Sequence, residues 1–248
     1  MKKLIALMIM LFISPPPASA SNDVVLSKFA ENVATHVLLH ELAHALIREF
    51  DLPVLGNEEV MADNFATFYT RKFDSTKAKE IVQDRALSWL LESKQAGLRD
   101  RDLQGEYPLD RRRAFRSLCH FYGSDPEDNH DFMELFRFSQ SEAGKCQTTS
   151  PEVERSWRRT LSPLWMPEGM LSREVNVIYG EGPMKKAMMK NGLLERIAIF
   201  ASRFDWHSQI TLNFDHCDQE AEWRRNSHTI LLCDDYVSRF LEQGSKSE

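Results

Sequence analysis

Several features that would point to familiar classes of protein are missing from this sequence. Beyond the first 20 residues, no apolar run approaches the roughly 20 residues that cross a bilayer, so we expect no membrane span. There is no internal repeat and no low-complexity segment. Basic residues are outnumbered by acidic ones, 31 to 37, which argues against nucleic acid as a partner because phosphate binding needs a basic surface.

The four cysteines include no CxxC pair, and this disfavours a zinc site built from thiolates. An even number of cysteines in an exported chain indicates disulfides instead. Their order along the chain favours the pairs Cys119–Cys146 and Cys217–Cys233, although the sequence alone leaves three connectivities open.

The first 20 residues have the order of a secretory signal peptide. Two lysines precede an apolar run over residues 4–13, and prolines and small residues follow it. We expect cleavage after Ala20, since the run is about half the length of a membrane span. Ser21 also stands where a lipid anchor would require cysteine. The mature chain would carry a formal charge of −8 (29 basic and 37 acidic residues) and be periplasmic or secreted, with no stable membrane anchor.

The spacing of apolar residues predicts mostly helices. We expect one helix over residues 31–50 and a second over residues 58–71, with Asn57 as the N-cap of the second. Further helices are expected over residues 75–94, 110–122, 131–139, 151–161 and 183–203.

Strand pattern occurs only near the C-terminus. Residues 210–214 alternate between apolar and polar, and residues 229–233 form a short β-rich run. The two could pair as a hairpin bridged by Cys217–Cys233. The expected fold is therefore α+β and mainly α, in one domain. Helices over residues 21–100 are followed there by a helical region and a small sheet over residues 101–248.

The most informative segment is His40-Glu41-Leu42-Ala43-His44. Helical residues four apart lie on one face, so His40 and His44 direct their imidazoles to the same side and can bind one Zn²⁺ ion. Glu41 is rotated about 100° around the helix axis from His40, so it can reach a water on the metal without being a ligand. This is the HExxH motif of zinc peptidases.

A catalytic zinc ion also needs a third protein ligand and an open position. Ile47 and Phe50 stand where a metzincin would carry glycine and its third ligand, which excludes that class. Glu59 and Asp63 lie four apart on the second helix. We expect Glu59 to be the third ligand and Asp63 to accept a hydrogen bond from a ligating histidine. Glu58 is a minority option as ligand, and the acids could also be only a favourable first helical turn.

These residues resemble a known grouping. The segment His40-Glu41-x-x-His44 followed by Glu59-x-x-x-Asp63 is similar to the gluzincin pattern, and the chain more narrowly resembles a bacterial metallopeptidase family of unknown biological role. The further matching blocks are Leu52-Pro53-Val54-Leu55-Gly56, Leu109-Asp110-x-x-Arg113 with Cys119, Tyr122-Gly123-Ser124-Asp125-Pro126, and Cys217 with Ile230-x-x-Cys233. The chain departs from the family at Arg111-Arg112 and Asp234-Asp235. The resemblance implies Zn²⁺ at the two histidines and Glu59, a zincin-like fold, and a peptide or protein substrate.

The expected reaction is hydrolysis of a peptide bond by a zinc-activated water, with Glu41 as general base. A donor should stabilise the oxyanion, and His207, near the predicted strands, is the first choice for this catalytic role. Weaker choices are Tyr69, His120 and Tyr122. We also expect residues 210–214 or 229–233 to align the substrate beside the site.

Two other interpretations stay open. The chain could be a zinc-binding or interaction protein that keeps a zincin-like fold but cleaves nothing, or an exported helical protein with a chance motif. Zinc content separates the chance motif from the other two. Loss of hydrolysis in Glu41→Gln with zinc retained would separate the peptidase from the non-catalytic protein.

Overall fold

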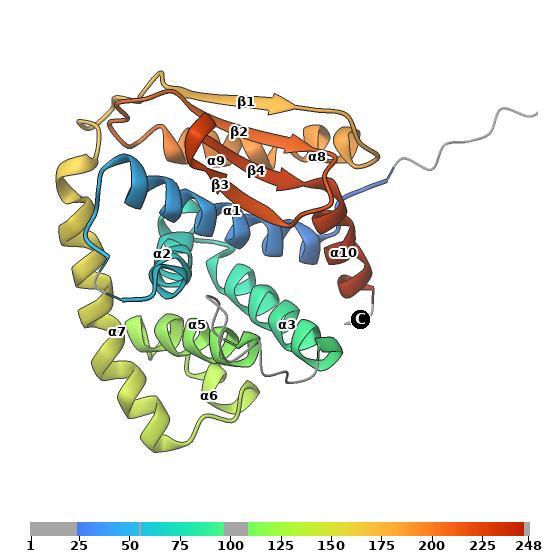
Figure 1. Ribbon diagram of the computed structural model, residues 1–248. Helices are drawn as coiled ribbons and strands as arrows, with labels where there is room; N and C mark the ends of the chain where they lie inside the picture. The colour runs from blue at the N-terminus through green and yellow to red at the C-terminus, as the bar shows by residue number, and fades with distance from the viewer. Residues whose placement is uncertain (1–23, 55, 97–108, 246–248) are drawn as a thin grey trace, which may run out of the picture.

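The computed structural model describes residues 24–54, 56–96 and 109–245, and they form an α+β protein, mainly helical, with one four-stranded sheet (Figure 1). The signal peptide expected over residues 1–20 lies outside these ranges. The helices are α1 (Lys28–Glu49), α2 (Glu58–Phe73), α3 (Ala78–Ala96), α5 (Asp110–Ser124), α6 (Asp131–Leu135), α7 (Gln140–Leu161), α8 (Lys185–Asn191), α9 (Leu193–Ala201) and α10 (Asp234–Gly244). The strands are β1 (Val175–Tyr179), β2 (Ile210–Asp215), β3 (Ala221–Arg224) and β4 (Thr229–Cys233). Among the described helices, none is both long and apolar enough to cross a membrane.

Helix α1 lies at the centre of the molecule, between the sheet and the helices α2 and α3 (Figure 1). Its first turn is capped by Ser27, whose hydroxyl accepts a hydrogen bond from the backbone N–H of Ala30 at 3.2 Å. From Ala30 to Ile47 every residue is buried except Glu31 and His44, which are half-buried. A helix without a polar face belongs in an interior. The predicted helix is confirmed, and the HExxH segment lies in its buried part.

Helix α2 begins where the sequence predicted. The side chain of Asn57 accepts a hydrogen bond from the backbone N–H of Val60 at 3.0 Å, so it is the N-cap. The buried residues Ala62 and Ala66 lie on this helix, which packs directly on α1. Their small side chains let the two backbones approach closely. This approach brings the acidic first turn of α2 next to the histidines of α1.

The predicted hairpin between residues 210–214 and 229–233 is wrong. These segments are β2 and β4, which lie side by side but run parallel. The strand order is β1-β2-β4-β3, and β3 pairs antiparallel with β4 at the edge of the sheet. After β2 the chain first forms β3 and then turns back to insert β4 between them. Strand β3 has only four residues and an Ala-Glu-Trp-Arg sequence, which is too short for an alternating pattern to be recognised.

Other element boundaries also differ from the predictions. The helix predicted over residues 183–203 is split into α8 and α9 by Gly192, which has a positive φ of 70° that favours glycine. Helix α7 begins well before Pro151, because Ser139 and Glu142 form a capping box that starts the helix. Helix α6 ends at Leu135 instead of near residue 139. Strand β1 and helix α10 were not predicted.

Both favoured disulfides are present. Cys119–Cys146 joins α5 to α7, and Cys217–Cys233 joins the segment after β2 to the end of β4. The second bond therefore closes the stretch of chain that contains β3. Two disulfides fit an oxidising environment outside the cytoplasm.

We expect His120 to make folding stability depend on pH. This histidine is buried, with Nδ1 3.2 Å from the hydroxyl of Ser150, and burial together with the charge of Arg116 lowers its pKa from 6.5 to about 4. Between these values the unfolded chain binds the proton and the folded chain does not. The stability contributed by this group is therefore present above pH 6.5 and is lost as the pH falls toward 4.

Urea denaturation of the wild type and of His120→Gln, from pH 7 to 4.5, would measure this contribution. The wild type should lose about 2 kcal/mol more over that range than the variant. The other titratable groups are common to both proteins, so their titration cancels in the difference. An equal loss in the two proteins would contradict the assignment.

Candidate metal centre

Side chains from α1 and α2 converge where these two helices pack together. His40 Nε2 lies 3.1 Å from His44 Nε2 and 3.2 Å from a carboxylate oxygen of Glu59. His44 Nε2 lies 3.4 Å from the other oxygen of Glu59. One ligand atom from each of the three residues lies within 4.8 Å of the others. His40, His44 and Glu59 could therefore hold a metal ion.

The second nitrogen of each imidazole is engaged by a carboxylate. His40 Nδ1 lies 2.9 Å from Asp63, and His44 Nδ1 lies 2.9 Å from Glu58. A neutral imidazole that donates from Nδ1 keeps the lone pair of Nε2 free. Both lone pairs then point at the same place. Metal-binding histidines in proteins have this arrangement, in which an outer carboxylate fixes the orientation of the ring.

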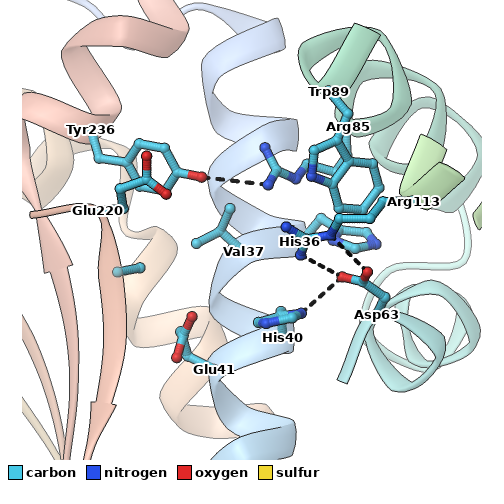
Figure 2. A pocket seen from close by; sticks show the side chains of 11 residues that line it. His36, Val37, His40, Glu41, Asp63, Arg85, Trp89, Arg113, Glu220 and Tyr236 are labelled. Carbon is cyan, nitrogen blue, oxygen red and sulfur yellow. Dashed lines mark hydrogen bonds and ion pairs between the residues drawn. The ribbon is translucent and has the colours of Figure 1, made fainter. Parts of the chain in front are cut away.

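Each of these outer carboxylates is in turn paired with an arginine. Arg113 donates two hydrogen bonds to Asp63, from Nε at 2.9 Å and from Nη2 at 2.8 Å (Figure 2). Arg48 donates to Glu58 at 2.6 Å. Burial acts to raise the pKa of Asp63, which is only 1% exposed, but Arg113 and His40 hold that pKa far below its usual range. Asp63 is therefore a fixed negative charge behind His40.

The charges around the two imidazoles favour a cation between them. Burial acts to lower the pKa of His44, but the carboxylates of Glu59, Glu41 and Glu58 outweigh it and raise this pKa to about 9. Burial raises the pKa of Glu59, and the two histidines outweigh it and lower that pKa to about 2. A divalent metal ion would supply the positive charge without protonating the imidazoles. The donor set thus fits a metal.

Glu41 does not join this group of ligands. It projects from α1 toward the sheet, whereas His40 faces α2 (Figure 2). Glu41 and Trp223 of β3 line the same cleft. Burial raises the pKa of Glu41, and the two nearby histidines and the backbone N–H of Trp223 oppose the rise. A buried carboxylate beside the metal ligands has the environment of a general base.

An open cleft leads from the surface to these residues. Its floor is formed by Glu41, His44 and Glu59, and one wall is β3, through Ala221 and Trp223. No strand among the described residues pairs with the other side of β3. The strand beside the site is therefore β3. The expectation that residues 210–214 or 229–233 would align a substrate there is wrong, because β2 and β4 are both inside the sheet.

The structure does not bring His207 to the site. Its side chain is exposed and its ring packs against Phe50, just past the end of α1, with ring centroids 5.4 Å apart. His207 lines neither of the two pockets that adjoin Glu41 among the described residues. The weaker choices Tyr69, His120 and Tyr122 do not line them either.

Three residues of the site had no role assigned from the sequence or had a different one. The sequence suggests Glu58 as a minority ligand or as part of a favourable first helical turn, and the structure places it behind His44. Arg113 belongs to a matching block without a role, and in the structure it donates hydrogen bonds to Asp63. Trp223 had no signal in the sequence, because its place depends on the strand order.

Comparison with known proteins adds one match. A family model described as "Putative metallopeptidase" matches residues 18–161, more than half of the chain. This range contains α1 and α2 with His40, His44 and Glu59, which we call the metal group. No curated protein and no solved structure matches the chain.

Proposed function

Because the chain belongs to this metallopeptidase family, we propose that it is an exported zinc-dependent peptidase with Glu41 as general base. The observation that carries the proposal is the convergence of His40, His44 and Glu59, with both Nε2 atoms facing each other at 3.1 Å. Two imidazoles and one carboxylate are a common ligand set for catalytic zinc, which keeps a fourth position for water or substrate. The two disulfides support export.

The residues around the metal group have separate tasks in this proposal. Bound zinc would acidify a water and polarise the scissile carbonyl. Glu41 takes a proton from the attacking water and delivers it to the leaving nitrogen. Asp63 and Glu58 hold the two imidazoles in the tautomer and orientation that ligation needs. Arg113 and Arg48 hold these carboxylates in place through hydrogen bonds.

Strand β3 aligns the substrate. A peptide in extended conformation can add to the edge of a sheet through backbone hydrogen bonds. Strand β3 is at the edge of the sheet, and Glu41 lines one cleft together with Ala221 and Trp223 of this strand. A peptide laid along this edge would pass its carbonyl groups over Glu41 and the metal ligands.

The first test is zinc content, by elemental analysis of the purified mature protein. We expect about one zinc ion per wild-type chain, since three protein ligands converge at one place. His44→Ala should retain much less zinc, because it removes one ligand. His130→Ala is a matched control, since His130 is exposed and its ring lies 3.3 Å from the carbonyl oxygen of Glu127, in its own turn. A wild-type protein that stays metal-free after zinc is supplied would overturn the proposal.

A further inference from the structure

A second, narrower pocket also adjoins Glu41 (Figure 2). It lies between α1, α3 and α10, and its far end is formed by Arg85 and Trp89 of α3 and Tyr236 of α10. Two hydrogen bonds tie α3 to α10 there, from Arg85 to Tyr236 at 3.4 Å and between Ser88 and Gln243 at 2.7 Å. The pocket is therefore closed at one end and meets the metal group at the other.

The guanidinium of Arg85 is buried in this pocket, and the ion pair it makes is long. Arg85 is 4% exposed, and its ion pair with Glu92, a partly exposed carboxylate, spans 3.8 Å. Its hydrogen bonds to Ser88 and Tyr236 are 3.3 and 3.4 Å long, and its Nε has no hydrogen-bond partner among the described residues. By contrast, Arg113 reaches its carboxylate at 2.8 Å. A buried charge with such weak contacts is unfavourable unless a counter-ion compensates it.

The other polar groups at the closed end match the same kind of ligand. The guanidinium of Arg85 lies over the ring of Trp89, 4.3 Å from its centroid, and the indole N–H of Trp89 also lacks a partner among the described residues. Both side chains only donate hydrogen bonds. Glu220 at the rim is engaged by Arg239 at 3.0 Å, so its charge is balanced outside the pocket. Donors beside an arginine are the usual site for a carboxylate.

The position of the pocket along β3 indicates which end of a peptide would enter it. The open cleft contacts β3 from Ala221 to Trp223, and the closed pocket contacts Glu220 and Ala221, at the start of the strand. A peptide that pairs antiparallel with β3, the more stable arrangement, runs from the open cleft toward the start of β3. Its residues after the scissile bond then enter the closed pocket.

We propose that Arg85, with Trp89 and Tyr236 as further donors, binds the free C-terminal carboxylate of a peptide substrate, so that the protein acts as a carboxypeptidase. This inference rests on the proposed function, because it names the substrate class of the same site. Water adds its oxygen to the carbonyl carbon of the last peptide bond and the C–N bond breaks. The proton taken by Glu41 goes to the leaving nitrogen, which releases the C-terminal amino acid and a shortened peptide.

The test compares N-acetylated peptides of one sequence, ending either in a free acid or in an amide, with zinc-loaded enzyme. We expect kcat/KM to be about 10- to 100-fold higher for the acid, the range for hydrogen bonds to a charged group. The first product should lack only the C-terminal residue. In Arg85→Gln the ratio of acid to amide should fall to about 1, with zinc content unchanged. Arg71→Gln is the matched control, because Arg71 also covers an aromatic ring, Phe121 at 4.0 Å, but lies away from the pocket.

Two results would overturn the inference and leave the proposed function intact. One is cleavage at internal bonds at equal rates for acid and amide. The other is a preference for the acid that Arg85→Gln leaves unchanged. If Arg85→Gln does not fold, the ratio of kcat/KM for acid and amide is measured on Arg85→Lys and compared with the wild-type ratio, and this comparison decides the question.

If the proposed function is wrong, the zinc-loaded protein hydrolyses neither the acid nor the amide peptide. Calorimetric binding of the two peptides to zinc-loaded Glu41→Gln then tests the carboxylate pocket by itself. Tighter binding of the acid supports the pocket, and equal affinity overturns it.

Discussion

Glu41→Gln is expected to bind zinc like the wild type and to hydrolyse peptides about 10²- to 10⁴-fold more slowly, the usual contribution of a general base. Glutamine preserves the shape of the side chain and can still meet the backbone N–H of Trp223. It cannot accept a proton from water. Measuring kcat/KM and zinc stoichiometry on the same preparations separates the loss of the base from the loss of the metal.

The matched control for this variant is Glu49→Gln. Glu49 is the last residue of α1 and pairs with His228 at 2.8 Å, outside the metal group. The control should keep both zinc and activity. Full activity in Glu41→Gln would exclude Glu41 as the base. A wild type that binds zinc but cleaves no peptide would instead favour a non-catalytic zinc-binding protein.

Arg113→Met is expected to destabilise folding by about 3–5 kcal/mol, the usual effect of removing one partner of a buried ion pair. Methionine keeps apolar contacts but leaves the carboxylate of Asp63 buried and uncompensated. Asp63 should then take up a proton or move, and His40 would lose its fixed partner. Loss of such an outer contact weakens metal binding by about 10- to 100-fold. Urea denaturation in chelator and competitive zinc titration measure the two effects.

The double variant Asp63→Asn with Arg113→Met separates charge burial from ligand orientation. It contains no uncompensated buried charge at this position, so it should regain part of the stability lost in Arg113→Met. Zinc affinity should stay low, since asparagine orients the imidazole of His40 less strongly than a carboxylate does. The expected loss of folding stability in Arg113→Met is at least about 3 kcal/mol. A loss of less than about 1 kcal/mol would show that another group compensates the charge of Asp63.

The metal group could be predicted from the sequence, because helix geometry fixes which side chains close in sequence share a face. His40 and His44 share a face whatever the rest of the chain does, and so do Glu59 and Asp63. The only longer-range assumption was that the two helices pack on each other. Small residues such as Ala62 supported that assumption, and the structure places the four side chains together.

The other half of the site depends on tertiary arrangement, which local patterns do not encode. Arg113, Trp223 and Arg85 come from three distant segments, and nothing in the sequence near each of them shows that they meet at the site. Strand β3 reaches Glu41 only because β4 inserts between β2 and β3. His207 was chosen because it lies near a strand in sequence, but it packs on Phe50 instead.

The split of the site between local and distant residues sets an order of assembly. The three proposed metal ligands lie between His40 and Glu59, on two consecutive helices, so this half of the site needs only contacts that are close in sequence. The cleft wall forms late, because β3 needs the sheet, and contacts between distant segments are slow to form. Closure of Cys217–Cys233 then fixes the stretch that contains β3. A newly made chain would therefore bind a metal before it can bind a peptide. Formation of the Cys217–Cys233 disulfide would mark the point at which it can bind its substrate.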